Sequence, residues 1–168
     1  MDFNIKDFNL KDVIENRSIL TVKEILNKKS INLKLDCHNK IQCRGYCYKA
    51  IEETNQYNIY VNILESLNED IFYFNKRGIL GDIFGGSKNI FNPKSKDDII
   101  LYSVLFTILH EYKHVLQYRD GRVDGVDTSL KDNKYIDEKA QELEYEAEDF
   151  ALENINNLIS GDYTCLIC

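Results

Sequence analysis

The spacing of hydrophobic and polar positions changes several times along the chain, and each change predicts a different element. Residues 12–28 carry apolar side chains at helical intervals, which predicts an amphipathic helix. Residues 31–37 alternate at period two, and residues 45–52 and 57–63 flank a short polar turn, so all three segments are predicted strands. We expect these strands to pair as a small antiparallel sheet. The glycine-rich residues 78–86 predict a connecting loop.

Two long helical patterns fill the C-terminal half. Residues 97–118 contain the most apolar stretch of the chain, and Ser95 with Asp98 has the spacing of a capping box at its start. Residues 137–159 form a second pattern, which ends in a Ser-Gly pair typical of a helix C-terminus. An N-terminal helix, a small sheet and two long helices indicate an α+β fold. The length suits a single domain over residues 1–168.

Composition and charge restrict the classes of function. With 43% hydrophobic and 29% charged residues, the chain has the composition of a soluble globular protein. The net charge of −7 falls on residues 137–153, and no basic stripe is present to bind nucleic acid. The apolar run at residues 99–109 is too short to cross a bilayer, and the first ten residues do not resemble a signal peptide. Five cysteines then indicate reduced thiols and a cytoplasmic protein.

The candidate chemistry lies in the first long helix, where the HEYKH segment beginning at His110 is an HExxH motif. His110 and His114 project from one helix face and can reach the same metal ion, while Glu111 lies beside them. One polar stripe crosses this otherwise apolar helix: Ser103, Thr107, His110, His114 and Gln117. A metal ion would satisfy the stripe; two core histidines held by hydrogen bonds are the alternative.

A third metal ligand is expected from the acidic helix. Most of its carboxylates project to one solvated side: Glu138, Glu142, Glu146, Asp149 and Glu153. Glu144 and Glu148 project to the opposite side, among three alanines that allow another helix to approach closely. We therefore expect Glu144 to be the third ligand and Glu148 to accept a hydrogen bond from a ligand histidine. The alternatives are a buried salt bridge or a different helix phase, with Glu138 or Glu142 as the ligand.

Residues 102–152 resemble a known group of enzymes. HEYKH followed by EYEAEDFA is similar to the glutamate zincins, metallopeptidases whose HExxH motif pairs with an ExxA(D/N)-type helix. The closest forms are the ImmA/IrrE-type and phage-type minimal metallopeptidases. The resemblance implies a minimal zincin-like fold, one zinc ion bound by His110, His114 and Glu144, and Glu111 as the catalytic carboxylate. Glu148 stands where these families carry Asp or Asn.

The expected activity is that of a small intracellular zinc metallopeptidase acting on a specific protein substrate, with Glu111 activating a water molecule at the zinc. The oxyanion-stabilising group is left open among five residues: His38, Tyr112, Tyr118, Arg119 and Tyr135. The resemblance to zincins also implies that residues 57–63 form the sheet edge that binds extended substrate. The alternatives are a zincin-fold metal-binding regulatory module without turnover and a metal-free protein whose acidic helix binds a basic partner.

The cysteines carry less specific signals. Cys37, Cys43 and Cys47 lie near His38, but their spacing fits no standard zinc motif, so we interpret them as strand or turn cysteines. The final four residues begin at Cys165 and have the C-a-a-X form of a prenylation signal; an ordinary hydrophobic tail or a CxxC pair is the alternative. Prenylation would add weak membrane association in a eukaryotic cell, natively or in the cytosol of a host.

Overall fold

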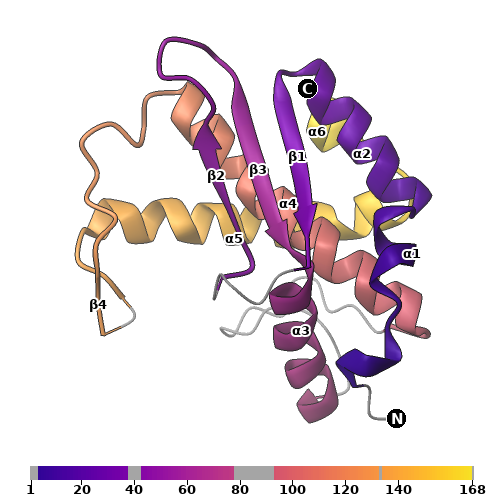
Figure 1. The fold of residues 1–168 in the computed structure, drawn as a ribbon. Coiled ribbons are helices and arrows are strands. Elements are labelled where there is room, and N and C mark those ends of the chain that lie inside the picture. The colour runs from indigo at the N-terminus through magenta and orange to yellow at the C-terminus, as the bar shows by residue number, and fades with distance from the viewer. Residues whose placement is uncertain (1–3, 38–42, 78–92, 133, 168) are drawn as a thin grey trace.

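The computed structural model describes residues 4–37, 43–77, 93–132 and 134–167, and they form an α+β fold (Figure 1). The elements in chain order are η1 (Ile5–Asp7), α1 (Leu10–Ile14), α2 (Arg17–Lys28), β1 (Ile31–Asp36), β2 (Gly45–Lys49), β3 (Tyr57–Asn62), α3 (Ile63–Arg77), α4 (Lys96–Arg119), β4 (Leu130–Lys131), β5 (Lys134–Tyr135), α5 (Glu138–Ile159) and α6 (Thr164–Ile167). The fold class expected from the sequence is confirmed.

β3 is the central strand of the three-stranded sheet, with β1 on one side and β2 on the other. β2 pairs with β3 in antiparallel fashion, but β1 pairs with β3 in parallel, so the sheet is mixed and the antiparallel expectation was wrong for β1. Burial explains the order: every residue of β3 is buried, whereas β1 and β2 carry exposed positions. The expectation that β3 is a substrate-binding edge was therefore also wrong.

α4 crosses one face of the sheet and contacts both β2 and β3 (Figure 1). It begins at the predicted capping box of Ser95 and Asp98, and α3 and α5 both pack against it. Of the helices in the described ranges, α4 alone is long and apolar enough to cross a membrane. However, 72% of its apolar window is buried inside the molecule. This extensive burial is also typical of the core helix of a soluble protein.

Two helical regions differ from the sequence interpretation. The single helix predicted over residues 12–28 is divided into α1 and α2, because the side-chain oxygen of Asn16 accepts hydrogen bonds from two backbone N–H groups of α2. α3 was not predicted; it follows β3 directly and buries Ile63, Leu67 and Ile71 on one side. The glycine-rich loop predicted after it lies outside the described residues.

α5 agrees with the predicted helix over residues 137–159, whereas α6 was not predicted. α5 ends at a Ser-Gly pair, and Gly161 has a φ of 89°, the left-handed conformation that terminates many helices. Cys165 lies in α6, which packs against α2 with Leu166 fully buried. The Cys165 thiol is itself partly buried, so prenylation would require α6 to leave this position.

Candidate metal centre

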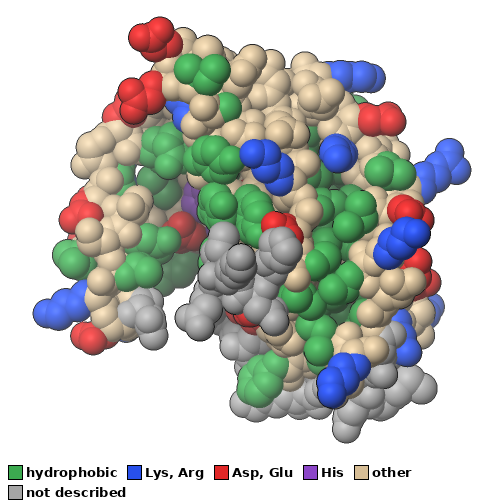
Figure 2. Space-filling view, in the orientation of Figure 1, with side chains coloured by type: hydrophobic (Ala, Val, Ile, Leu, Met, Phe, Trp, Pro, Cys, Tyr) green, Lys and Arg blue, Asp and Glu red, His purple; other side chains and the backbone are tan. Residues whose placement is uncertain are grey.

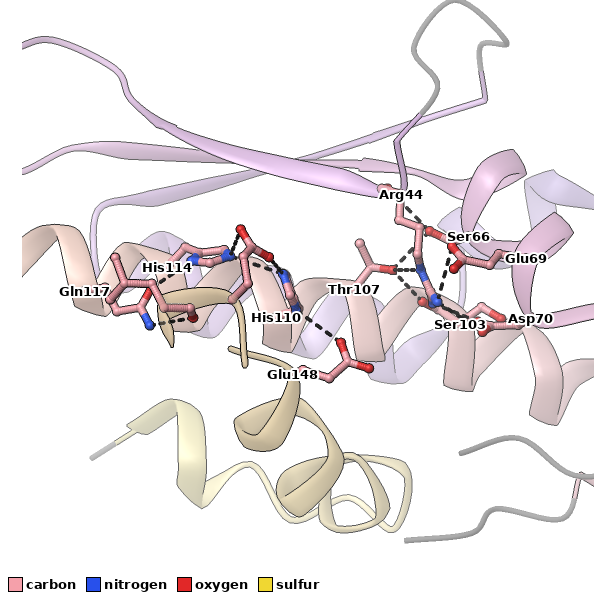
Figure 3. Close-up of polar contacts among 12 residues, drawn as sticks. Arg44, Ser66, Glu69, Asp70, Ser103, Thr107, His110, His114, Gln117 and Glu148 are labelled. Carbon is pink, nitrogen blue, oxygen red and sulfur yellow. Dashed lines mark hydrogen bonds and ion pairs between the residues drawn. The ribbon is translucent and has the colours of Figure 1, made fainter. Parts of the chain in front are cut away.

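Three side chains from the two long helices converge at one point. The Nε2 atoms of His110 and His114 are 3.1 Å apart (Figure 3). The two carboxylate oxygens of Glu144 lie 3.2 Å from the Nε2 of His110 and 3.3 Å from the Nε2 of His114. All three residues are partly buried, and together they could hold a metal ion. The triad expected from the sequence is thus brought together by the fold.

The spacing within this triad fits a tetrahedral metal ion. In a tetrahedral site with metal–ligand distances of about 2.0–2.1 Å, neighbouring ligand atoms are about 3.3 Å apart. The two Nε2 atoms are 3.1 Å apart, and each lies 3.2 or 3.3 Å from a different oxygen of Glu144, so each of these contacts is close to that spacing. With Glu144 binding through one oxygen, the three residues supply three ligands. A fourth corner is then left for water or a substrate atom.

Close packing of α5 against α4 brings the carboxylate to the histidines. The alanines that share its side of α5 are buried almost completely: Ala140, Ala147 and Ala151. The absence of larger side chains permits the close approach of the two helices. The predicted phase of α5 is therefore supported by both burial and contacts.

Hydrogen bonds and burial act in opposite directions on the pKa values of His110 and Glu144. Burial lowers the pKa of His110, but the hydrogen bond to Glu144 and the nearby Glu148 carboxylate outweigh this effect and raise it above its ordinary 6.5. Burial raises the pKa of Glu144, but the hydrogen bond with His110 and the nearby His114 ring outweigh it and hold the pKa well below its usual range. A metal ion must therefore displace a proton from His110 in order to bind near neutral pH.

We predict that metal affinity rises with pH. The raised pKa keeps His110 protonated above pH 6.5, so each metal ion bound should release about one proton, and affinity should rise about tenfold per pH unit. Isothermal titration calorimetry with zinc chloride, in two buffers of different ionisation enthalpy, measures this release. Affinity that is constant between about pH 7 and pH 9 would contradict the shifted pKa.

Glu148 lies behind His110, on the side of the ring away from the triad. Its Oε2 is 3.6 Å from the Nδ1 of His110, the nitrogen that does not face Glu144 (Figure 3). Glu148 thus lies where the sequence predicted it, one helical turn after Glu144, but at 3.6 Å the contact is an ion pair and is longer than the expected hydrogen bond. A carboxylate there would orient the imidazole and raise its basicity as a ligand.

We predict that Glu148→Ala weakens zinc binding by about 10- to 100-fold without unfolding the protein. Competition with a chromophoric chelator measures the affinity, and circular dichroism checks the fold. Asp149→Ala is the matched control, because Asp149 is exposed on the same helix. Equal zinc affinity in the two variants would show that Glu148 does not support His110.

Glu146 departs from the expectation that it is solvated. Its side chain is 32% exposed and accepts two hydrogen bonds from the guanidinium group of Arg122, at 2.5 and 2.7 Å. Arg122 lies in the segment after α4, so its position could not be derived from the projection of α5 alone. The other members of the predicted solvated face are exposed: Glu138, Glu142, Asp149 and Glu153.

A pocket of about 400 Å³ opens over the triad. One wall is β2 and the other is the segment that joins α4 to α5, residues 120–137, which we call the arm. Figure 2 shows the pocket as a hollow with a histidine side chain at its bottom. The lining residues beyond the triad include Gly45, Tyr46 and Cys47 from β2, Tyr118 from α4, and Val123, Val126, Thr128 and Tyr135 from the arm.

Glu111 also lines this pocket, beside the triad. It is 6% exposed, and none of the described residues donates a hydrogen bond to its carboxylate. Burial raises its pKa, although the neighbouring His110 and His114 oppose the shift. A buried carboxylate with a raised pKa, facing a pocket, is suited to accept a proton.

A buried ion pair anchors β2 to the helices at the edge of this site. Arg44 donates two hydrogen bonds to Asp70 of α3, at 3.1 and 2.8 Å, and a third to the Thr107 hydroxyl of α4, at 3.3 Å (Figure 3). A Cβ on the neighbouring Gly45 would lie 2.8 Å from the Thr107 methyl and 3.2 Å from the Glu111 Cγ. The strand therefore approaches α4 as closely as glycine allows. The sequence interpretation missed Arg44, because its partners lie far away in the chain.

The structure separates the candidates for oxyanion stabilisation. Tyr118 and Tyr135 line the pocket, and the Tyr135 hydroxyl donates a hydrogen bond of 3.0 Å to the candidate carboxylate ligand. Tyr112 and Arg119 instead contact Lys29 at the end of α2: the Tyr112 hydroxyl accepts a hydrogen bond from the Lys29 ammonium, and Arg119 donates one to the Lys29 carbonyl. His38 lies outside the described residues. Tyr118 and Tyr135 therefore remain as the candidates inside the pocket.

The described cysteines do not join the triad. Cys47 lies in β2 and lines the pocket, whereas Cys37 follows β1 and Cys43 precedes β2. Burial raises the pKa of the Cys47 thiol, so it is protonated at neutral pH. Among the described residues, the group close enough to share a metal ion contains two histidines and a glutamate.

Comparisons of the chain with protein-family models, with curated proteins and with solved structures give no significant match. The interpretation of the site therefore depends on the geometry and chemistry of its own residues.

Proposed function

We propose that the chain is a small zinc metallopeptidase that hydrolyses peptide bonds of a protein substrate. The supporting observation is the triad of His110, His114 and Glu144 beside the buried Glu111: the two Nε2 atoms are 3.1 Å apart, and each lies 3.2 or 3.3 Å from an oxygen of Glu144. Two imidazoles and one carboxylate, with one corner left open, form a ligand set used by catalytic zinc. The proposal assigns zinc binding to these three residues and proton transfer to Glu111.

The residues of the pocket divide the chemistry between them. Zinc, when bound, acts as a Lewis acid that polarises the scissile carbonyl and lowers the pKa of water toward 7. Glu111 takes a proton from the attacking water and returns it to the leaving amine. The buried environment of Glu111 supports this role, since a raised pKa brings the carboxylate closer to the working pH. Tyr118 and Tyr135 line the pocket and are the candidates to stabilise the oxyanion.

The outer edge of β2, which pairs with no further strand among the described residues, is the proposed substrate-binding edge in place of β3. The Arg44 carbonyl accepts a hydrogen bond of 2.8 Å from the Asn62 N–H of β3. Since backbone groups alternate along an antiparallel strand, Gly45 and Cys47 direct their N–H and C=O groups away from β3. These groups border the pocket and can bind an extended peptide by strand addition.

The test is cleavage of a peptide library by the zinc-loaded protein. We expect mass spectrometry to detect new termini that disappear on adding a chelator and return on adding zinc. Zinc binding without any cleavage would favour the alternative, a metal-binding regulatory module. The buried Glu111 favours the enzyme, because an unpaired carboxylate in this place costs stability and a binding module has no need of it.

A further inference from the structure

A buried amide links one candidate ligand to the second long helix. Gln117 lies on α4, one turn after His114, and is 1% exposed. Its Oε1 is 2.7 Å from the Nδ1 of His114 (Figure 3). Its Nε2 donates hydrogen bonds to the Leu143 carbonyl at 3.0 Å and to Glu146 Oε2 at 3.3 Å. Both acceptors belong to α5.

These partners determine which way the amide points. The Leu143 carbonyl and the Glu146 carboxylate can only accept hydrogen bonds, so the NH₂ group of Gln117 must face them. The amide oxygen then faces His114, and it can only accept. The Nδ1 of His114 must therefore carry a proton, which in the neutral ring leaves the Nε2 lone pair directed at the triad.

The end of α4 brings Arg122 into the same network. The backbone N–H of Arg122 donates a hydrogen bond to the backbone carbonyl of Gln117, and the backbone N–H of Gly121 donates one to that of Tyr118. This is the pattern of a Schellman motif. Gly121 supports this turn with a φ of 68°. The chain therefore folds back beside Gln117, and the Arg122 guanidinium pairs with Glu146 through two hydrogen bonds.

We propose that Gln117 is a positioning residue that fixes His114 as the Nδ1–H tautomer, and that Glu146 and Arg122 orient Gln117 for this role. Its use in catalysis rests on the proposed zinc peptidase function. The network also links the arm to the metal centre, because Arg122 belongs to the arm. The carboxylate of Glu148 lies behind the His110 ring. Behind the His114 ring lies the Gln117 amide, which is itself oriented by the ion pair of Glu146 and Arg122.

The test compares three variants in zinc-affinity measurements by chelator competition. Gln117→Leu removes the acceptor and should weaken zinc binding by about 10- to 100-fold. Gln117→Glu should also weaken it, because a second carboxylate then faces Glu146. The double variant Gln117→Glu/Glu146→Gln restores an amide opposite a carboxylate, and its zinc affinity should exceed that of Gln117→Glu but recover only in part, because the Leu143 carbonyl still lacks its donor. Asp149→Asn is the exposed control on α5.

Two readouts separate positioning from a general structural role. Thermal unfolding of the metal-free variants reports stability, and ¹⁵N NMR of the His114 ring reports its tautomer with or without zinc. We expect loss of the hydrogen-bonded Nδ1–H signal in Gln117→Leu and its return in the double variant. Unchanged zinc affinity in Gln117→Leu, or lowered stability with an unchanged tautomer, would overturn the proposal. If the wild type binds no zinc, the proposed function fails, and the NMR signal still decides the role of Gln117.

Discussion

Replacing Glu111 by glutamine is expected to reduce cleavage by at least about 100-fold while leaving zinc bound. The amide keeps the shape of the side chain but cannot accept a proton from water. Glu111 is outside the triad, so the variant should hold zinc at the stoichiometry of the wild type. Atomic absorption measures the zinc, and initial rates on one cleaved library peptide measure the loss.

The same variant also tests the electrostatic description of the site. Glu111 is buried, and none of the described residues donates a hydrogen bond to it, so neutralising it should not lower the melting temperature of the protein. Glu142→Gln is the matched control, since Glu142 is an exposed glutamate outside the pocket. Full turnover by Glu111→Gln would contradict the assigned role, whatever its zinc content.

The candidate site could be predicted because its residues follow regular spacings within two helical segments of the sequence. The stripe on α4 follows from helical periodicity, and four of its five members have polar partners: Thr107 contacts Arg44, His110 and His114 face Glu144, and Gln117 faces α5. The buried Ser103 hydroxyl has no hydrogen-bond partner among the described residues. The phase of α5 follows in the same way from its alanines. Helix geometry alone then places the carboxylate opposite the histidines.

The errors concern relations between distant segments. The sequence pattern of β3 predicts a strand but not its place in the sheet, because the central position depends on which strands pair with it. Glu146 has the spacing of a solvated residue, but the turn after α4 brings Arg122 onto it. The start of α3 could have been predicted from the sequence. Asn is a common residue just before a helix, and Asn62 does accept a hydrogen bond from the Glu65 N–H. Ile63, Leu67 and Ile71 then follow at intervals of four residues.

Glu144→Ala is expected to have the largest effect on metal binding, a loss of zinc affinity of at least about 100-fold. Outer partners of a ligand histidine typically contribute 10- to 100-fold, and a direct ligand should contribute no less. The Tyr135 hydroxyl also loses its acceptor, so the pocket loses a contact between the arm and α5. Competition with a chelator at fixed pH measures the affinity.

Glu144→Gln refines this test, because it keeps the size of the side chain and can still accept a hydrogen bond from Tyr135. A neutral amide is a weaker zinc ligand than a carboxylate, which carries a negative charge, so this variant should lose zinc but keep the fold. Glu142→Ala, at an exposed site two residues earlier, should bind zinc like the wild type. If Glu144→Ala retains zinc with unchanged affinity, the third ligand lies elsewhere. The short distances between Glu144 and the two histidines would then reflect an ion pair between His110 and Glu144.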